Sequence, residues 1–267
     1  MSLLLIAGVL SPGRAHAQMP FYTDDPGVTE PGILHLEVFD ELDGLQSSRY
    51  PDLRQNTTNL RVNFSPLRHF ELDVDAPYIV IDRAAGSETS RGVGDTNMGL
   101  KWNFRETPPD SLRPAYAVSL YIEFPTGKVS EGLGSGLTDY ALNFIMQKPV
   151  SQSTRFNFNV GILFAGNTST GAIGIQTRRG QVYTGGVCLL HDVSPRLTVG
   201  GELYGGVSDG AGPNRTQLQA MLGAQYEIRD GLMISLGVLG GKYGATPQIG
   251  GQLGVAVDLP TLLRRPP

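Results

Sequence analysis

The stretch GDTNMGLKWNF (residues 94–104) alternates between two kinds of side chain along its length. One face would carry Thr96, Met98, Leu100, Trp102 and Phe104, and the other Asp95, Asn97, Lys101 and Asn103. A period of two residues predicts a β-strand with one apolar and one polar face. A soluble sheet would turn the apolar face to a protein core, whereas a membrane barrel would turn it to lipid. The fold class depends on which face points inward.

The same alternation recurs along the chain, and we count about twelve such segments without any helical periodicity. The segment at 181–191 is the weakest, because both of its faces are mostly apolar or Gly. Connections alternate in length. The short ones lie near 65–68, 107–113, 149–154, 192–196 and 229–231, and the long ones near 41–55, 83–93, 125–136, 166–180, 208–215 and 242–248. Short turns at one end and long loops at the other are typical of outer-membrane barrels.

Segment length and the chemistry of the polar face favour the membrane interpretation. The segments run to about ten residues, which a tilted strand needs to cross a bilayer. Their polar face is rich in Asn, Gln, Gly, Ser and Tyr, which suits a confined aqueous lumen. Aromatic residues at strand ends, such as Phe64, Phe104, Phe124 and Tyr226, suit interfacial girdles. We therefore predict an all-β fold, a transmembrane antiparallel up-and-down β-barrel of about twelve strands over residues 32–259. A secreted β-sandwich or another soluble barrel is the alternative.

The two ends of the chain indicate export to the bacterial outer membrane of a Gram-negative cell. Residues 3–10 are apolar, and Ala15-His16-Ala17 forms an A-x-A cleavage site, so residues 1–17 are predicted to be a signal peptide. Residues 18–31 would then be a periplasmic N-terminal segment, and residues 260–267 a C-terminal tail. The stretch QLGVAVDL (252–259) resembles the signal that the barrel-assembly machinery recognises, although its apolar positions are aliphatic. The expected partners are this machinery, outer-membrane lipid and a small-molecule solute.

Composition limits the other functions of the chain. A formal net charge of −4 argues against nucleic acid as a partner. The single cysteine, Cys188, permits neither an internal disulfide nor a cysteine metal cluster. Short apolar runs leave no candidate for a spanning helix beyond the N-terminus.

No constellation of residues points to catalysis, so we predict a protein that is not an enzyme and has no catalytic residues, cofactor or metal. His35, His69 and His191 are far apart and lack metal-ligand spacing. Residues 206–210 match G-x-S-x-G, but a loop rather than a helix follows them. Glu71, Asp73 and Asp75 share one strand face and could bind Ca²⁺, although a solvated lumen wall is the simpler interpretation.

The polar faces predict which residues line the lumen. The set comprises Arg61, Glu71, Asp73, Asp75, Asp95, Asn97, Lys101, Tyr121, Glu123, Asp139, Asn143, Asn157, Glu202, Tyr204 and Gln219. Acids outnumber bases on these faces, so anions should be disfavoured relative to neutral solutes and cations. The Gly-rich connection that begins with Pro125-Thr126-Gly127 could fold inward as a constriction, with Lys128, Glu131 and Ser135 as candidate residues.

Three stretches carry a resemblance to a known family. They are PFYTDDPGVTEPGILHLE (20–37), GVGDTNMGLKWNF (92–104) and FPTGKVSEGLGSGLTDYALNF (124–144). In order and spacing they resemble the outer-membrane transporters associated with the meta-pathway of phenol degradation. The resemblance implies a transmembrane, porin-like barrel that helps small aromatic or hydrophobic compounds to cross the outer membrane. We therefore expect passive uptake of small neutral solutes. A non-conducting structural or surface-interaction barrel is the alternative.

Overall fold

A computed structural model describes residues 19–108, 111–164, 180–208 and 216–261 of the 267-residue chain. The predicted signal peptide at 1–17 and residues 262–267 of the predicted tail lie outside the described residues. Nearly all of the long connections predicted at 166–180 and 208–215 lies outside them too. Within the described residues, no helix is long and apolar enough to cross a membrane.

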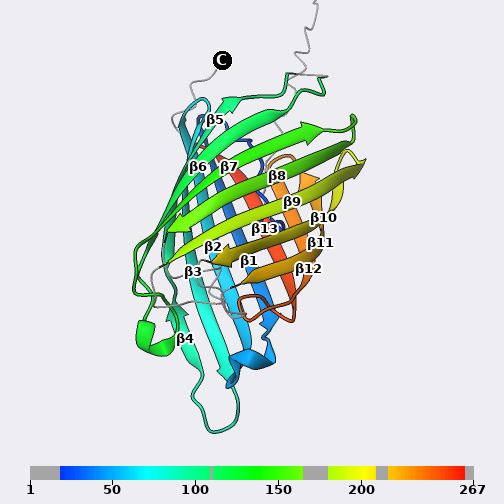
Figure 1. The fold of residues 1–267 in the computed structure, drawn as a ribbon. Helices are drawn as coiled ribbons and strands as arrows, with labels where there is room; N and C mark the ends of the chain where they lie inside the picture. Colours follow the sequence, from blue (N-terminus) through cyan, green and yellow to red (C-terminus); the bar gives the residue numbers. More distant parts are fainter. Residues whose placement is uncertain (1–18, 109–110, 165–179, 209–215, 262–267) are drawn as a thin grey trace, which may run out of the picture.

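The described residues form one antiparallel sheet that closes on itself (Figure 1). Its strands are β1 (Ile33–Gly44), β2 (Asp52–Leu67), β3 (Phe70–Arg83), β4 (Ser90–Val93), β5 (Thr96–Arg105), β6 (Ala115–Phe124), β7 (Asp139–Pro149), β8 (Thr154–Phe164), β9 (Gln181–Ser194), β10 (Leu197–Ser208), β11 (Gln217–Arg229), β12 (Leu232–Gly241) and β13 (Ile249–Pro260). Two 3₁₀ helices, η1 (Ser47–Arg49) and η2 (Val129–Glu131), lie in the long connections.

Pairing of β13 with β1 closes the barrel between the last strand and the first. The short β4 pairs only with residues 78–81 of β3, near the end of that strand. It therefore extends the wall but is not one of the strands that close the barrel. The other strands form a closed antiparallel barrel of 12 strands, which confirms the predicted fold class and strand number. In Figure 1 the described long connections and β4 lie at one end of the barrel, and the C-terminal end of β13 lies at the other.

Side-chain exposure shows which face of the opening stretch points inward. Met98 is 50% exposed and Trp102 is 46% exposed, whereas Lys101 is 1% exposed and Asn103 is 5% exposed. The apolar face is therefore on the outside of the barrel and the polar face on the inside. Exposed apolar residues on the other strands extend this outer surface, which has the chemistry of a lipid-facing wall.

An aromatic row crosses the outer wall near the short-turn end of β3, β5, β6 and β7. Consecutive ring centroids lie 5.6 to 6.0 Å apart along the series Phe70, Trp102, Phe104, Tyr116 and Phe144. Rings at this depth match the interfacial girdle of a membrane barrel, where an aromatic side chain meets both hydrocarbon and polar headgroups.

Two connections differ in extent from the sequence-based expectation. β2 continues through residues 65–67, so the turn consists of Arg68 and His69 instead of residues 65–68. A register shift between Phe64 and Leu67 accommodates Pro66, which cannot donate to the ladder. At the other end, β1 reaches Gly44 and β2 starts at Asp52, so the expected 41–55 connection is shorter. Both strands continue as a paired ribbon past the length that we assigned to them.

Candidate functional site

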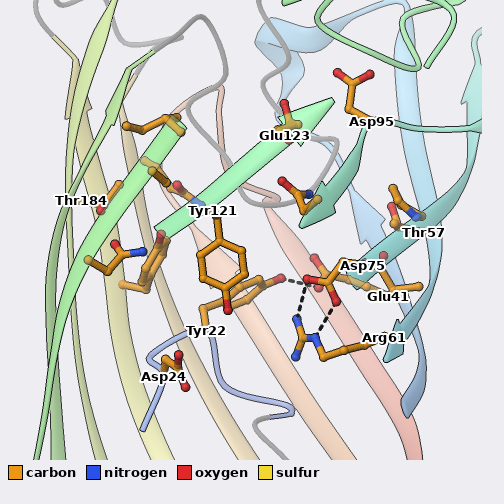
Figure 2. A pocket seen from close by; sticks show the side chains of 18 of the residues that line it. Tyr22, Asp24, Glu41, Thr57, Arg61, Asp75, Asp95, Tyr121, Glu123 and Thr184 are labelled. Atoms are coloured by element: carbon orange, nitrogen blue, oxygen red, sulfur yellow. Dashed lines mark hydrogen bonds and ion pairs between the residues drawn. The ribbon is translucent and has the colours of Figure 1, made fainter. Parts of the chain in front are cut away.

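Residues 19–31 precede β1, and residues 19–29 of this segment run inside the barrel; Figure 2 shows Tyr22 and Asp24 on it within the lumen. Met19, Phe21 and Thr23 are buried there. We call residues 19–31 the inner segment. The sequence interpretation assigned these residues to a periplasmic segment but did not predict that they return into the lumen.

Polar side chains of the wall satisfy the backbone of the inner segment. The Glu202 carboxylate of β10 accepts the backbone N–H groups of Tyr22, at 3.2 Å, and Thr23, at 2.5 Å. The Gln225 amide of β11 donates to the Met19 carbonyl at 2.6 Å. A buried backbone group outside a sheet needs such a partner, because an unpaired one costs about as much as a lost hydrogen bond.

The opposite wall holds the rest of the inner segment. The Glu71 carboxylate of β3 accepts both the N–H and the hydroxyl of Thr29, each at 2.6 Å. The Asn103 amide of β5 donates to the Pro26 carbonyl at 2.7 Å. The segment is thus bonded to strands on two sides of the lumen and crosses it.

A buried ion pair joins the inner segment to β5. The Lys101 ammonium lies 3.2 Å from the Asp24 carboxylate and 3.1 Å from that of Glu71. Burial raises the pKa of Asp24 to about 6, and the nearby ammonium only partly opposes this shift. One cation therefore balances two buried carboxylates, one from the wall and one from the inner segment.

An apolar patch on the inner wall receives Phe21. Cys188, Leu190, Met221 and Leu239 project inward from β9, β11 and β12, and all are buried against this phenylalanine. A water-filled lumen would leave these side chains hydrated. Contact with Phe21 accounts for the two apolar faces that made 181–191 the weakest strand signal.

Glycines on neighbouring strands leave room for the inner segment. Gly223 of β11 and Gly237 of β12 are paired across the sheet beneath Pro20. A Cβ atom added at these positions would lie 2.4 Å and 2.9 Å, respectively, from the proline ring. A Cβ at Gly186 of β9 would lie 2.4 Å from the Thr23 hydroxyl. The wall has no side chains at the points where the segment touches it most closely.

A cavity occupies the lumen between the inner segment and the long connections. Its volume, including space open to solvent, is about 1830 Å³. Figure 2 shows Tyr22, Arg61, Asp75 and Tyr121 around the same space. The lining combines tyrosine rings, amides and carboxylates with some aliphatic side chains, so the cavity offers both aromatic faces and hydrogen-bonding groups.

Arg61 is held by acids on both neighbouring strands. Its Nε lies 2.6 Å from the Asp75 carboxylate, and its Nη1 lies 3.4 Å from the Glu37 carboxylate. Its guanidinium also lies 5.3 Å from the centroid of the Phe39 ring. Arg61 is the only basic side chain among the described residues of the lining, so the cavity is acidic on balance.

Tyr22 provides the wall of the cavity on the inner-segment side. Its hydroxyl donates to the Glu41 carboxylate and accepts from the Gln252 amide at 2.9 Å. Its ring stacks on that of Tyr204 with centroids 5.7 Å apart. Burial, followed in size by the carboxylates of Glu41 and Asp43, raises the pKa of Tyr22 well above its ordinary value. The phenol therefore stays neutral and remains a hydrogen-bond donor.

The structure separates the predicted lumen residues into two groups. Those that line the cavity are Arg61, Asp75, Asp95, Asn97, Tyr121, Glu123, Asp139, Asn143, Tyr204 and Gln219. Those buried on the inner wall outside the lining are Glu71, Asp73, Lys101, Asn157 and Glu202. In the second group, Glu71, Lys101 and Glu202 bind the inner segment, whereas Asp73 accepts the Tyr121 hydroxyl at 3.1 Å and Asn157 accepts the Gln147 amide at 3.0 Å.

The three residues proposed for the constriction loop lie in different places. Ser135 is buried, whereas Lys128 is exposed and pairs with the half-buried Glu131. Leu133, which lies between Glu131 and Ser135 in sequence, lines the cavity, but the sequence analysis did not single it out. Tyr22 and Glu41 were also missed. The T-D-D-P motif that follows Tyr22 was the available signal.

Comparison with solved structures places the fold among outer-membrane barrels. An outer membrane channel from Pseudomonas putida F1 aligns with a TM-score of 0.66 at 13% identity, over 88% of this chain and 98% of that one. The NanC porin aligns with a TM-score of 0.57 at 9% identity, over 84% of this chain and 100% of that one. The KdgM porin, solved in complex with disordered oligogalacturonate, aligns with a TM-score of 0.53 at 12% identity, over 84% of this chain and 98% of that one. No curated protein sequence matches the chain.

A family model provides the match at the level of sequence. Its description is "Putative MetA-pathway of phenol degradation", and it matches residues 23–258. That range includes all three stretches that carry the family resemblance, apart from the first residues of the earliest one. Because the match extends over most of the chain and the barrel, this protein belongs to that family.

Proposed function

We propose that the protein is an outer-membrane channel for the passive uptake of small neutral solutes, aromatic and hydrophobic ones included. The observation that supports this proposal is the acidic, tyrosine-lined cavity inside a barrel whose outer wall is apolar. The family description adds a link to phenol degradation. In this proposal, outer-membrane lipid surrounds the wall, and the barrel-assembly machinery inserts it.

The charges of the cavity favour uncharged solutes over anions. Arg61 is neutralised by Asp75 and Glu37, so it offers little attraction to a free carboxylate or phosphate. Other carboxylates of the lining add a negative potential, which raises the energy of an entering anion. A neutral solute meets no such barrier.

The tyrosines explain how a flat, weakly polar solute could be accepted. Tyr22 and Tyr204 present a stacked pair of rings, and the Tyr121 ring faces the same cavity. An aromatic solute can exchange water for contact with these rings, with a gain of roughly 0.5–1.5 kcal/mol per ring pair beyond area burial. Hydroxyls and amides nearby can bind a single polar substituent.

The orientation in the membrane follows from the two ends of the barrel. Short turns face the periplasm in barrels of this type, and the inner segment continues into β1 at that end. The inner segment would therefore narrow the periplasmic exit, after removal of residues 1–17 as a signal peptide. Residues 260–267 would remain on the periplasmic side.

A non-conducting barrel is the second candidate, and the inner segment specifically favours it. Hydrogen bonds, an ion pair and an apolar contact hold residues 19–31 across the lumen. If this segment leaves no continuous path, the protein would act through its wall or its long connections rather than by conducting solutes.

Uptake by proteoliposomes tests the channel proposal. The refolded protein would be compared with empty vesicles for a neutral phenolic, a sugar of similar size and a small dicarboxylate. Uptake of the neutral solutes above the empty-vesicle rate, with the dicarboxylate slower, supports the channel. Rates equal to those of empty vesicles for every solute would exclude it and favour the non-conducting barrel.

A further inference from the structure

An apolar pair on β3 interrupts the polar inner wall near the long-connection end. Ile79 and Ile81 project inward and are buried at 1% and 3% exposure. Leu133, from the connection between β6 and β7, covers both of them and is 2% exposed. The connection therefore folds into the lumen at this point, and Leu133 also lines the cavity.

One carboxylate holds the connection in this position. Asp95, which immediately precedes β5, accepts the Gly127 N–H at 2.9 Å on one oxygen and the Ser135 N–H at 2.6 Å on the other. These donors belong to the two limbs of the connection, before and after Leu133. Asp95 thereby ties both limbs to the wall and to each other.

Close backbone contact between the limbs makes this arrangement specific. A Cβ atom added at Gly134 would lie 2.4 Å from an Asp95 carboxylate oxygen and 2.8 Å from the Gly127 Cα. Thr126 reinforces one limb, because its hydroxyl donates to the Gly94 carbonyl at 2.7 Å and accepts the Thr96 N–H at 3.0 Å. We call these contacts around Asp95 the clasp.

We propose that the clasp fixes Leu133 in the mouth of the cavity and that Leu133 sets the size limit for solutes that enter. This inference rests on the proposed channel function and adds the residue that determines selectivity by size. An apolar side chain in the path presents no polar group to replace the hydration shell of an ion, so it also favours neutral solutes. The charged residues of the same connection, Lys128 and Glu131, pair with each other outside the lining.

The clasp can be tested without any conduction. Leu133→Cys in a Cys188→Ser background would be labelled with a bulky maleimide in the folded barrel. Asp95→Asn replaces one acceptor oxygen with an amide donor that faces a backbone N–H. The hydrogen bond lost is one between a carboxylate and an N–H, and its contribution to stability corresponds to a rise in labelling rate of about tenfold or more. Gly134→Ala should give the same rise by steric exclusion. Asp82→Asn, an exposed change on β3, should give none.

The size limit is measured on the same barrels by conductance and by uptake of a graded series of uncharged sugars. Leu133→Ala should raise conductance and admit larger sugars, and Asp95→Asn should do the same. Val129→Ala, at an exposed position of the same connection, is the matched control and should change neither.

The outcomes separate the two proposals. Labelling that is unchanged in both Asp95→Asn and Gly134→Ala overturns the clasp. If the wild-type barrel conducts and Leu133→Ala has the same size limit, the proposed role of Leu133 is overturned, but the channel proposal stands. Absence of conduction in the wild type and in every variant overturns the channel itself, and with it the size limit.

Discussion

Substitution of Gly223 by alanine tests whether the inner segment docks in solution as the structure describes. The new Cβ would lie 2.4 Å from Pro20 Cγ, about 1 Å closer than an ordinary contact, and 3.1 Å from a backbone carbonyl oxygen of β12. The proline ring cannot rotate away, so either it or the wall must move. Gly251→Ala on β13 is the control, because its Cβ would lie 3.7 Å from the nearest atom, an ordinary van der Waals contact.

The magnitude follows from the cost of overpacking. An extra methyl group in a closely packed site costs about 1–3 kcal/mol. Applied to docking alone, this raises the population of undocked segment by roughly 5- to 150-fold, because each 1.4 kcal/mol is a factor of ten. The pairing of β11 with β12 should be retained, since the closest clash is with the segment and not with the sheet.

Labelling of Thr23→Cys in a Cys188→Ser background of the folded protein provides the assay, because Thr23 is buried at 3% exposure when docked. When closing is faster than labelling, the rate is proportional to the undocked population. We expect Gly223→Ala to label at least about fivefold faster and Gly251→Ala to match the parent. Equal rates in all three proteins would refute the docked position of the segment.

Three further predictions concern the buried charges and the outer wall. Lys101→Met leaves the carboxylates of Asp24 and Glu71 buried without their cation, so it should destabilise the folded protein by about 3–5 kcal/mol in urea unfolding; an unchanged midpoint would contradict this. Because the pKa of Asp24 is raised to about 6, docking should strengthen as the pH falls through this value and weaken as it rises. The Thr23→Cys labelling rate, divided by the rate in an Asp24→Asn background at the same pH, should therefore fall on acidification, and a constant ratio would be incompatible with the shift. Trp102, the single tryptophan, lies on the outer wall, so brominated acyl chains should quench its fluorescence; quenching by aqueous iodide alone would indicate a soluble barrel.

The barrel wall could be predicted from the sequence because its determinants are local. Alternation within each strand identifies two faces, and residues such as Met98 and Lys101 lie on the faces that the pattern assigned to them. The strand number and the closed antiparallel fold were confirmed. The role of the lumen set stays a prediction, although the structure places those residues on the inner wall.

The contents of the lumen could not be predicted in the same way, because they depend on contacts between residues far apart in sequence. Glu202 binds Thr23 across 179 positions, and nothing local to either residue indicates this. Two local exceptions to the alternation coincide with such contacts, although only the 181–191 segment was noted from the sequence. Ile79 and Ile81 are apolar at inward positions, and so is Leu190 in the weak 181–191 segment. Each exception marks a place where another segment covers the wall.

This distinction also explains which motifs carry the family resemblance. Many sequences satisfy the alternation of a barrel wall, and solved barrels with a TM-score above 0.5 share only 9–13% identity with this chain. The three stretches include parts of β1, β5 and β7, but they also include carboxylates that bind the segments folded into the lumen. Asp24, in the stretch 20–37, pairs with Lys101, and Asp95, in the stretch 92–104, accepts the N–H groups of Gly127 and Ser135 in the stretch 124–144. A buried carboxylate with two backbone donors, or with one ammonium, tolerates few substitutions. In this chain, the carboxylates of Asp24 and Asp95 hold the segments that fill the lumen, whereas the alternation of the strands builds the barrel.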